Sequence, residues 1–407
     1  MKILIVSQYF WPESFGINQL ANDLVAEGVQ VDVLTGMPNY PQGDFYKGYG
    51  GVCTISERWG KLNIFRLPII RRGLNSRFRL AANYLSFLLS GFLLSPILLR
   101  GKKYDLIFVY GVSPILQSLV AAWLGKLKKI PVILWVQDLW PESVVETGYL
   151  KSKVLFKLLE VMTRLCYKTS DMILAQSEAF LDSIGRLAPN RKIYYFPNSI
   201  DKSFYQGGNA TDRIIPSLAE GFSILFAGNI GSAQAVDVIV RSAEKLKDFV
   251  EIKFVIMGDG SKLRWLQSEI KRLGLTNVHY EGSFPIEEMP KILRQASALL
   301  VTLSNKEIFG LTIPNKIQAY LAVGRPIIGS LNGEGAKIIE QAGAGFSASA
   351  EDADDLVKVI LKMYKLRRSK LNEMGDNGRK YFKLNFDSEM LTKKLIVHFE
   401  TLGNRCE

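Results

Sequence analysis

Residues 309–329 contain a pattern typical of an anion-binding site, a lysine at the start of a predicted helix. Pro314, Asn315 and Lys316 open this predicted helix, because proline suits a first turn and asparagine can cap one, and Gly324 ends it. A helix N-terminus carries free N–H groups and positive partial charge, and a lysine there adds a full charge. The pattern predicts an anion site suited to phosphate, with an ordinary crossover helix as the alternative.

Two glycine-bearing turns could complete such a site. Each follows a predicted strand and precedes a predicted helix: Gly228-Asn229-Ile230-Gly231 and Gly258-Asp259-Gly260. Glycine lets the backbone approach a ligand closely, so that N–H groups can reach phosphate oxygens. Two such turns that converge with the loop at 304–316 would indicate a nucleotide-binding site.

Two carboxylates in the first half are candidates for acid–base or orienting chemistry. Asp138 follows the predicted strand 131–136, and ligands collect at the carboxyl ends of strands in open α/β sheets. We expect Asp138 to orient or deprotonate a substrate hydroxyl, with a turn-capping aspartate as the alternative. Glu13 is a second candidate, on a loop where Gly16 could let the backbone approach a ligand or could simply start a helix.

Several other chemistries find little support in the sequence. Both histidines, His279 and His398, lie in segments with a structural pattern, which disfavours a Ser-His-Asp or Cys-His site. The run Asp352-Ala353-Asp354 begins a predicted helix, where acidic side chains favour the helix dipole, so we expect no metal site there. A Walker A motif is also missing from the sequence.

These candidates are positioned by two series of alternating strands and helices, which predict open parallel sheets. Strands are expected at 2–7, 31–34, 105–110, 131–136, 171–175 and 192–196, and then at 222–226, 251–256 and 327–329. The Gly/Tyr/Pro segment 36–60 is expected to be an ordered loop that contacts substrate. A polar linker at 199–221 would separate domains 1–198 and 222–385, and a C-terminal helix at 386–407 would return to the first domain.

The composition is that of a folded protein with two domains: 407 residues, 48% hydrophobic and 22% charged. Cys53, Cys166 and Cys406 lie far apart and suggest neither a disulfide framework nor a metal site, which favours a reducing compartment. The N-terminal sequence MKILIVSQYFWPE is typical of a first β-strand and not of a signal peptide.

Positive charge and apolar residues gather in the first half. Residues 1–200 contain 23 Lys and Arg against 14 Asp and Glu, whereas residues 201–407 contain 28 against 25. This excess predicts an anionic partner such as phospholipid, and not nucleic acid, because no nucleic-acid-binding signature accompanies it. The hydrophobic stretch 80–99 has basic flanks, so we expect a membrane-contacting region near 77–103, with a buried core helix or a true span as alternatives.

Seven segments spread over nearly the whole chain resemble family 4 of the glycosyltransferases: SQYFWPESFGIN, LTGMPNYPQG, WVQDLWPES, PNSID, FAGNIGSAQAVDVI, MGDG and IPNKIQAYLAVGRPII. They look most like the branch that assembles O-antigen and capsule, of the WbuB type assigned N-acetyl-L-fucosamine transfer. The resemblance implies an α/β protein of the GT-B fold, with two Rossmann-like domains whose parallel sheets face an inter-domain cleft.

The same resemblance implies an activity and a location. The reaction would be retaining transfer of a sugar, such as N-acetyl-L-fucosamine, from a UDP-sugar to a saccharide on undecaprenyl diphosphate. It would serve O-antigen, lipopolysaccharide or capsule synthesis and need no metal, because protein groups hold the diphosphate. The protein would be cytoplasmic, and peripheral or monotopic on the cytoplasmic face of the inner membrane.

The chain departs from the family pattern at positions that contact the donor. Asn229 and Gln234 occupy places where the family usually has an arginine and a lysine. Ala319 occupies the place of the second of two paired glutamates, and Glu307 only approximates the first. The two amides can donate hydrogen bonds to a diphosphate but cannot neutralise its charge.

Lys316 is the best remaining source of positive charge, together with the helix start at Pro314 and Asn315. Gln318 is the candidate for the ribose contact that the second glutamate makes in relatives. As charge builds on the leaving UDP, Lys316 and the N–H groups around Gly231 would stabilise the transition state more than the ground state.

Two rival functions fit the same pattern. A GT-B epimerase or phosphorylase would keep the fold and change the reaction. A membrane-associated scaffold with a decayed nucleotide site would explain the missing charged residues without catalysis. Fold alone does not decide among them, because one fold supports many functions.

Overall fold

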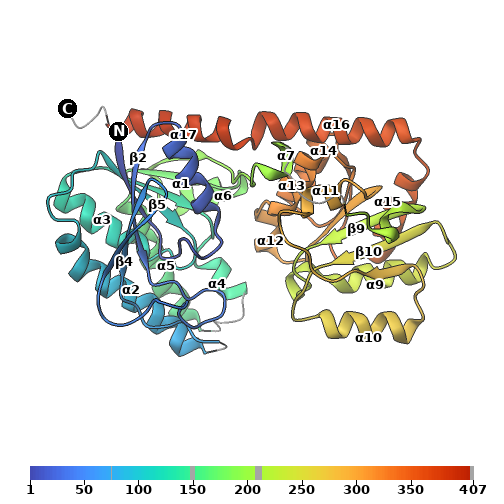
Figure 1. Cartoon of the computed structure of the whole chain (residues 1–407), viewed down its shortest axis with the longest axis horizontal. Coiled ribbons are helices and arrows are strands. Elements are labelled where there is room, and N and C mark those ends of the chain that lie inside the picture. The colour runs from blue at the N-terminus through green and yellow to red at the C-terminus, as the bar shows by residue number, and fades with distance from the viewer. Residues whose placement is uncertain (75, 147–151, 207–212, 404–407) are drawn as a thin grey trace. The chain divides into compact units, whose positions relative to one another are not determined.

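The chain forms two units, each built around its own sheet (Figure 1). In the computed structural model, residues 1–74, 76–146, 152–206 and 213–403 are described. Unit 1 comprises Met1–Asn198 and Ser388–Glu407, and unit 2 comprises Ser199–Asp387. Both units are α/β domains with parallel sheets, as predicted.

The sheet of unit 1 has the strand order β3-β4-β2-β1-β5-β6-β7-β8. Every neighbouring pair is parallel except β3 and β4. The inner strands are continuous apolar runs such as LIFVYG in β5, which is what burial on both faces requires. The strands are β1 (Lys2–Val6), β2 (Gln30–Gly36), β3 (Ile55–Trp59), β4 (Leu62–Leu67), β5 (Leu106–Gly111), β6 (Val132–Val136), β7 (Met172–Ala175) and β8 (Lys192–Tyr195).

Helices cover both faces of this sheet. Helix α1 leads from β1 to β2 in one direction, whereas α2, α3, α5 and α6 accompany crossovers in the other direction, and right-handed crossovers then put these four on the opposite face from α1. Helix α17 packs against α1 and contributes Leu391, Leu395 and Phe399 to the same core cluster. The helices are α1 (Gly16–Ala26), α2 (Arg77–Leu98), α3 (Gln117–Lys128), α4 (Glu142–Glu146), α5 (Lys153–Lys168), α6 (Ala179–Leu187) and α17 (Ser388–Gly403).

The sheet of unit 2 is entirely parallel, in the order β11-β10-β9-β12-β13-β14. Its strands are β9 (Phe222–Ala227), β10 (Ile252–Met257), β11 (Val278–Tyr280), β12 (Ala298–Thr302), β13 (Ile327–Ser330) and β14 (Gly345–Ala348). The helices are α7 (Ser203–Gln206), α8 (Pro216–Ala219), α9 (Val236–Lys245), α10 (Leu263–Leu273), α11 (Met289–Leu293), α12 (Glu307–Leu311), α13 (Asn315–Val323), α14 (Glu334–Gln341), α15 (Ala353–Tyr364) and α16 (Arg368–Asn385), with a 3₁₀ turn at Ser232–Gln234.

The predicted linker at 199–221 is wrong, because its described residues belong to unit 2 and contain α7 and α8. Phe204, Ile215 and Leu218 are buried there, so this mostly polar segment still packs against the core through three apolar side chains. Residues 207–212 of that segment, and 404–407 of the predicted C-terminal helix, lie outside the described residues.

The predicted loop at 36–60 is also wrong at its end, where β3 pairs with β4 in an antiparallel hairpin. The ISERW sequence of β3 has no apolar run, since it is an edge strand with alternating exposure. By contrast, the expected role of Asp352 is confirmed: its side chain caps α15 by accepting hydrogen bonds from the N–H groups of Asp354 and Asp355.

Candidate active site

In unit 2 the two glycine turns lie against each other, beyond the carboxyl ends of β9 and β10. The Gly228 N–H donates to the Met257 carbonyl at 2.9 Å. A Cβ added to Gly258 would lie 1.9 Å from the Gly228 carbonyl oxygen, and both glycines have φ near +131°. A side chain at Gly258 would collide with the backbone of Gly228, and one at Gly228 would be strained by its positive φ, so the close approach of the turns depends on glycine.

A second set of backbone contacts joins the two turns further on. The Ile230 N–H donates to the Asp259 carbonyl at 2.8 Å, and the Lys262 N–H donates to the Ile230 carbonyl at 2.9 Å. Gly260 fits only because it has no side chain, since its Cβ would lie 2.4 Å from the Ile230 oxygen. The predicted convergence of the turns is thus present in the structure.

Asn229 and Gln234 lie on this surface and bind each other. The Asn229 Nδ2 atom donates to Gln234 Oε1 at 3.2 Å. A Cβ on Gly231 would approach both amides, at 2.9 Å and 3.1 Å from these two atoms, so Gly231 gives the pair its room. A neutral amide pair therefore occupies the positions where the family usually has an arginine and a lysine.

The loop after β12 closes the same group of turns from the other side. The Ser304 N–H donates to the Ala233 carbonyl at 2.9 Å, and the Thr302 hydroxyl donates to the Gln234 carbonyl. This loop leads through α12 to the start of α13. The loop at 304–316 therefore joins the glycine turns as expected.

Helix α13 begins at Asn315, with Pro314 as an extended N-cap residue that gives no side-chain hydrogen bond. The expectation that asparagine caps this helix is therefore wrong, because Asn315 is already the first helical residue. Gly324 ends the helix in the left-handed conformation at φ +75°, as predicted.

The side chain of Lys316 runs from α13 to the end of β9. Its Nζ atom lies 3.7 Å from the centre of the Phe226 ring, in cation–π geometry. A Cβ on Gly228 would lie only 2.7 Å from Lys316 Cε. The glycine after β9 thus makes space for the lysine, and the predicted phosphate-binding turn and helix start meet at this side chain.

The ammonium group of Lys316 is buried and has no hydrogen-bond partner in the described part of the chain. Burial lowers its pKa from 10.5 to about 7. An unpaired buried charge is unfavourable, and an aromatic ring replaces only part of its hydration. A strongly perturbed group beside two glycine turns is the expected signature of a functional site that an anion completes.

Gln318, the predicted ribose contact, does not fit that role. Its side chain is fully buried within α13. The helical spacing explains this, since Gln318 lies between the buried Ile317 and Ala319 on a helix that the fold encloses on most sides. The ribose contact was proposed from the family resemblance alone, which does not show whether the side chain is buried.

Glu13, a predicted catalytic carboxylate of unit 1, is fully buried and held by backbone groups. One oxygen accepts hydrogen bonds from the N–H groups of Asn39 and Tyr40, both at 2.7 Å, and the other accepts from Phe10 N–H at 3.2 Å. Desolvation raises its pKa to about 7, although these hydrogen bonds act against the rise. Glu13 therefore ties two loops together, and its side chain has no exposed surface from which to reach a substrate in this structure.

Asp138 lies half-buried just beyond β6, as predicted. Its Oδ2 atom accepts hydrogen bonds from the Ser113 N–H at 2.8 Å and the Ser113 hydroxyl at 2.9 Å. Trp140 Nε1 donates to the same hydroxyl at 2.9 Å. The carboxylate is thus fixed at the carboxyl edge of the sheet, partly as the loop cap that was the alternative for this residue.

Tyr110 at the end of β5 was missed by the sequence reasoning, although its place at a strand end was a usable signal. Burial and the nearby charge of Asp138 raise the pKa of its hydroxyl. Gly16 begins α1, and a Cβ there would lie 3.6 Å from the Tyr110 hydroxyl, an ordinary contact distance. The structure thus brings Gly16 and Asp138 to the same tyrosine, but it does not require glycine at Gly16.

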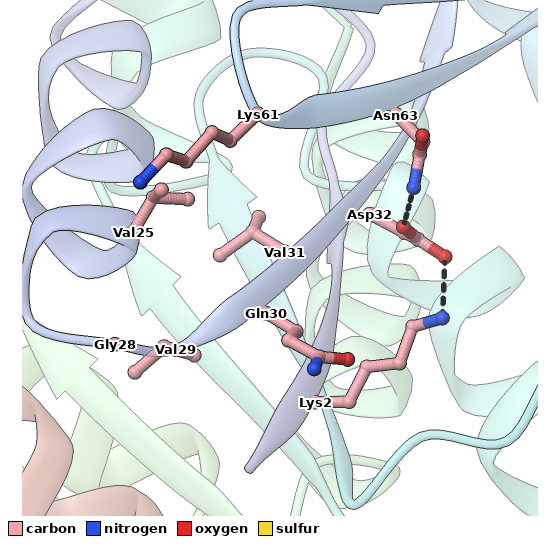
Figure 2. A pocket seen from close by; sticks show the side chains of 9 residues that line it. All are labelled: Lys2, Val25, Gly28, Val29, Gln30, Val31, Asp32, Lys61 and Asn63. Carbon is pink, nitrogen blue, oxygen red and sulfur yellow. Dashed lines mark hydrogen bonds and ion pairs between the residues drawn. The ribbon is translucent and has the colours of Figure 1, made fainter.

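A polar pocket of about 340 Å³ in unit 1 lies at the opposite, amino-terminal edge of the sheet (Figure 2). Its central carboxylate, Asp32, accepts hydrogen bonds from Asn63 at 2.7 Å and from the Tyr104 hydroxyl at 2.8 Å. Lys2 lies 3.3 Å from the same carboxylate. Because Asp32 is fully partnered and lies away from the carboxyl ends of the strands, we do not place the active site here.

Comparison with known proteins identifies both halves of the chain. Residues 15–199 match the glycosyl transferase 4-like domain, and residues 211–381 match the family of glycosyl transferases group 1. WcaI of Escherichia coli (strain K12), named as a colanic acid biosynthesis glycosyl transferase, is 24% identical over 340 residues, which cover 80% of this chain and 82% of WcaI.

Solved structures show the same fold at low identity. Sucrose-phosphate synthase from Thermosynechococcus elongatus superposes with a TM-score of 0.74 at 15% identity, over 98% of both chains. HepE of Anabaena, solved in complex with UDP and glucose, superposes with a TM-score of 0.66 at 14% identity, over 99% of this chain and 100% of HepE. The chain is thus a glycosyltransferase of the GT-B fold, built from a glycosyl transferase 4-like domain and a group 1 glycosyl transferase domain.

Proposed function

We propose that this glycosyltransferase moves a sugar from a UDP-sugar to a lipid-linked saccharide, with retention of the anomeric configuration. The observation that carries the proposal is the buried, unpaired ammonium of Lys316 beside Gly228. A diphosphate at the glycine turns would give this charge its missing partner. The complex of the similar HepE with UDP supports uridine as the nucleoside.

Charge develops on the leaving diphosphate as the bond between sugar and phosphate breaks. Lys316, and backbone N–H groups at the turn of Gly231 and at the start of α13, would stabilise that charge in the transition state. Backbone hydrogen bonds of Ile230 with Asp259 and Lys262 already hold the turn, so little reorganisation would be needed during the reaction. Protein groups would hold the diphosphate without a metal.

In unit 1 we assign Asp138 to the acceptor. Its hydrogen bonds with Ser113 fix the carboxylate at the sheet edge where α/β proteins collect their ligands. From there it would orient the acceptor hydroxyl or take its proton. Glu13 would act at a distance, by fixing the loop that carries Asn39 and Tyr40.

For the substrates we propose an N-acetylated deoxyhexosamine donor, such as UDP-N-acetyl-L-fucosamine, and an acceptor saccharide on undecaprenyl diphosphate. The sequence resemblance to the WbuB type supports this choice. The name of WcaI, which refers to colanic acid biosynthesis, supports a place in O-antigen or capsule synthesis.

We place the protein in the cytoplasm, peripheral or monotopic on the inner membrane. Helix α2 supports this location: by length and composition it is the one helix among the described residues that could cross a membrane. Its buried residues repeat every four positions (Asn83, Phe87, Gly91 and Ser95), so one face packs on the protein, and the other side exposes leucines such as Leu89 and Leu93.

The test is the thermal shift of the purified protein with UDP, GDP, ADP or TDP at equal concentration, without added metal. A ligand that binds only the folded state raises the apparent stability by mass action. We expect UDP to stabilise the protein most. Selectivity for GDP would contradict the UDP-sugar donor, and no response to any nucleotide would favour the non-catalytic scaffold that the neutral pair of Asn229 and Gln234 suggests.

A further inference from the structure

Helix α5 of unit 1 exposes an apolar stripe that nothing in the described chain covers. Val154, Leu158, Val161 and Leu165 are all exposed, with Leu158 at 53% and Val161 at 63%. Their spacing of four, three and four residues puts them on one side of the helix. Single apolar residues on a surface need no explanation, but a contiguous stripe marks an interaction site.

Helices α2 and α3 lie on the same face of the sheet as α5. Gly91 of α2 fits closely against Val120 of α3, since a Cβ on the glycine would lie 2.6 Å from the valine. On the other side of α3, Ser118 contacts Cys166 of α5. All three helices therefore form one layer, in which the outward residues of α2 and α3 include exposed apolar side chains: Phe78, Leu85, Leu89, Leu93 and Ile97, and Trp123 and Leu127.

This layer is strongly basic. Its three helices carry one acidic residue, Glu160, which is 2.7 Å from Arg164 in an ion pair. The helices α1 and α17 on the opposite face carry two lysines against three acidic residues. The basic residues of the layer are Arg77, Arg79, Lys126, Lys128, Lys153, Lys157, Arg164 and Lys168.

We propose that α2, α3 and α5 form one membrane-binding face that lies on an anionic bilayer, with the α5 stripe as a contact separate from α2. This inference rests on the proposed membrane location of the enzyme. Charge and shape both favour lipid as the occupant. Anionic headgroups attract each lysine and arginine near the surface, and the apolar residues enter the boundary between headgroups and acyl chains.

A second copy of the chain fits this face poorly. Two such faces packed against each other would bring two strongly basic layers together, with one acidic side chain on each. Like charges in contact oppose association. A partner protein would need an acidic surface across three helices, whereas an anionic bilayer offers a flat negative surface without further requirements.

The experiment measures sedimentation of the full-length protein with vesicles of phosphatidylcholine containing about one-third phosphatidylglycerol. Val161→Ser in α5 is matched by Val397→Ser in α17, because Val397 is 59% exposed on the opposite face. Lys157→Glu is matched in the same way by Lys394→Glu, an exposed residue of α17. Both pairs make equal chemical changes on opposite faces.

We expect Val161→Ser to weaken vesicle binding about five-fold and Lys157→Glu about ten-fold, with both α17 controls unchanged. The role of α5 would be overturned if all α5 variants bind vesicles as strongly as the wild type while Leu89→Ser in α2 weakens binding. The proposed membrane location would then remain intact. If Val161→Ser instead converts a dimer into a monomer and vesicle binding persists, the stripe is an interface between copies. The UDP thermal shift of the same samples reports the nucleotide site independently.

Discussion

Replacing Lys316 by methionine should make the free protein more stable while it weakens nucleotide binding. Methionine keeps an unbranched apolar side chain between α13 and Phe226 but removes the buried ammonium that has no partner. A lysine pKa of about 7 against 10.5 corresponds to about 5 kcal/mol at 1.36 kcal/mol per unit. We expect about half of this to be recovered, roughly 2–3 kcal/mol, because the new side chain also has to fit.

The gain should depend on pH in a defined direction. Because the folded pKa lies below the unfolded one, the unfolded chain binds more protons between pH 7 and pH 10.5, and the free energy of unfolding rises with pH in that window. The penalty on the wild type is complete below pH 7 and is relieved as pH rises. The advantage of Lys316→Met should therefore be largest near pH 6.5 and clearly smaller at pH 9.5.

Thermal unfolding by calorimetry at these two pH values is the assay. For a unit of this size, roughly 2–3 kcal/mol corresponds to an increase in Tm of about 5–10 °C. Lys247→Met, at an exposed position after α9, is the control and should leave the Tm unchanged. A Tm of Lys316→Met below that of wild type at pH 6.5, or an equal gain at both pH values, would refute the reasoning.

Three further changes test the remaining parts of the site. Gly228→Ala should abolish the UDP thermal shift and lower the Tm, because the new methyl group would meet Lys316 and the backbone has φ +131°; an unchanged shift would contradict the close contact. Asp138→Asn should reduce kcat about 100-fold or more, with UDP binding retained, since asparagine can still accept from Ser113; a normal kcat would remove Asp138 from the chemistry. The pKa of Glu13 is raised to about 7, so the wild type should lose stability relative to Glu13→Gln as pH rises from 4.5 to 7. Chemical denaturation at several pH values measures this difference, and a difference that stays constant with pH would contradict the buried carboxyl.

The parts of the fold that follow from local pattern could be predicted. Continuous apolar runs identified the inner strands β1, β5, β6 and β9, because burial on both faces leaves no polar position. Strand β3 at the edge of the sheet has no such run, and neither β3 nor its partner β4 was among the predicted strands. The segment 199–221 was wrongly predicted as a linker because its composition is polar overall. Its three buried apolar residues, Phe204, Ile215 and Leu218, are too few to change that composition.

The candidate site shows the same division. The glycine turns and Lys316 could be predicted because each depends on local chain geometry and one functional residue type. The roles of Glu13 and Gln318 could not, because burial is decided by distant segments: Asn39 and Tyr40 are far from Glu13 in sequence but enclose it in the fold. The contact of the Lys316 ammonium with Phe226 could not be predicted either, because the segment FAGNIGSAQAVDVI does not show which side chain its phenylalanine will face.

The most direct test of the account is the pH dependence of UDP-sugar affinity, measured by calorimetric titration of wild type and Lys316→Met between pH 6.5 and pH 8.5. If a diphosphate binds the protonated lysine, wild-type affinity should fall about 25-fold over this range, because the free protein loses that proton near pH 7. The methionine variant should bind weakly at every pH, with no such slope. Equal affinities of the two proteins, or a wild-type affinity that does not change with pH, would contradict the claim that Lys316 holds the diphosphate.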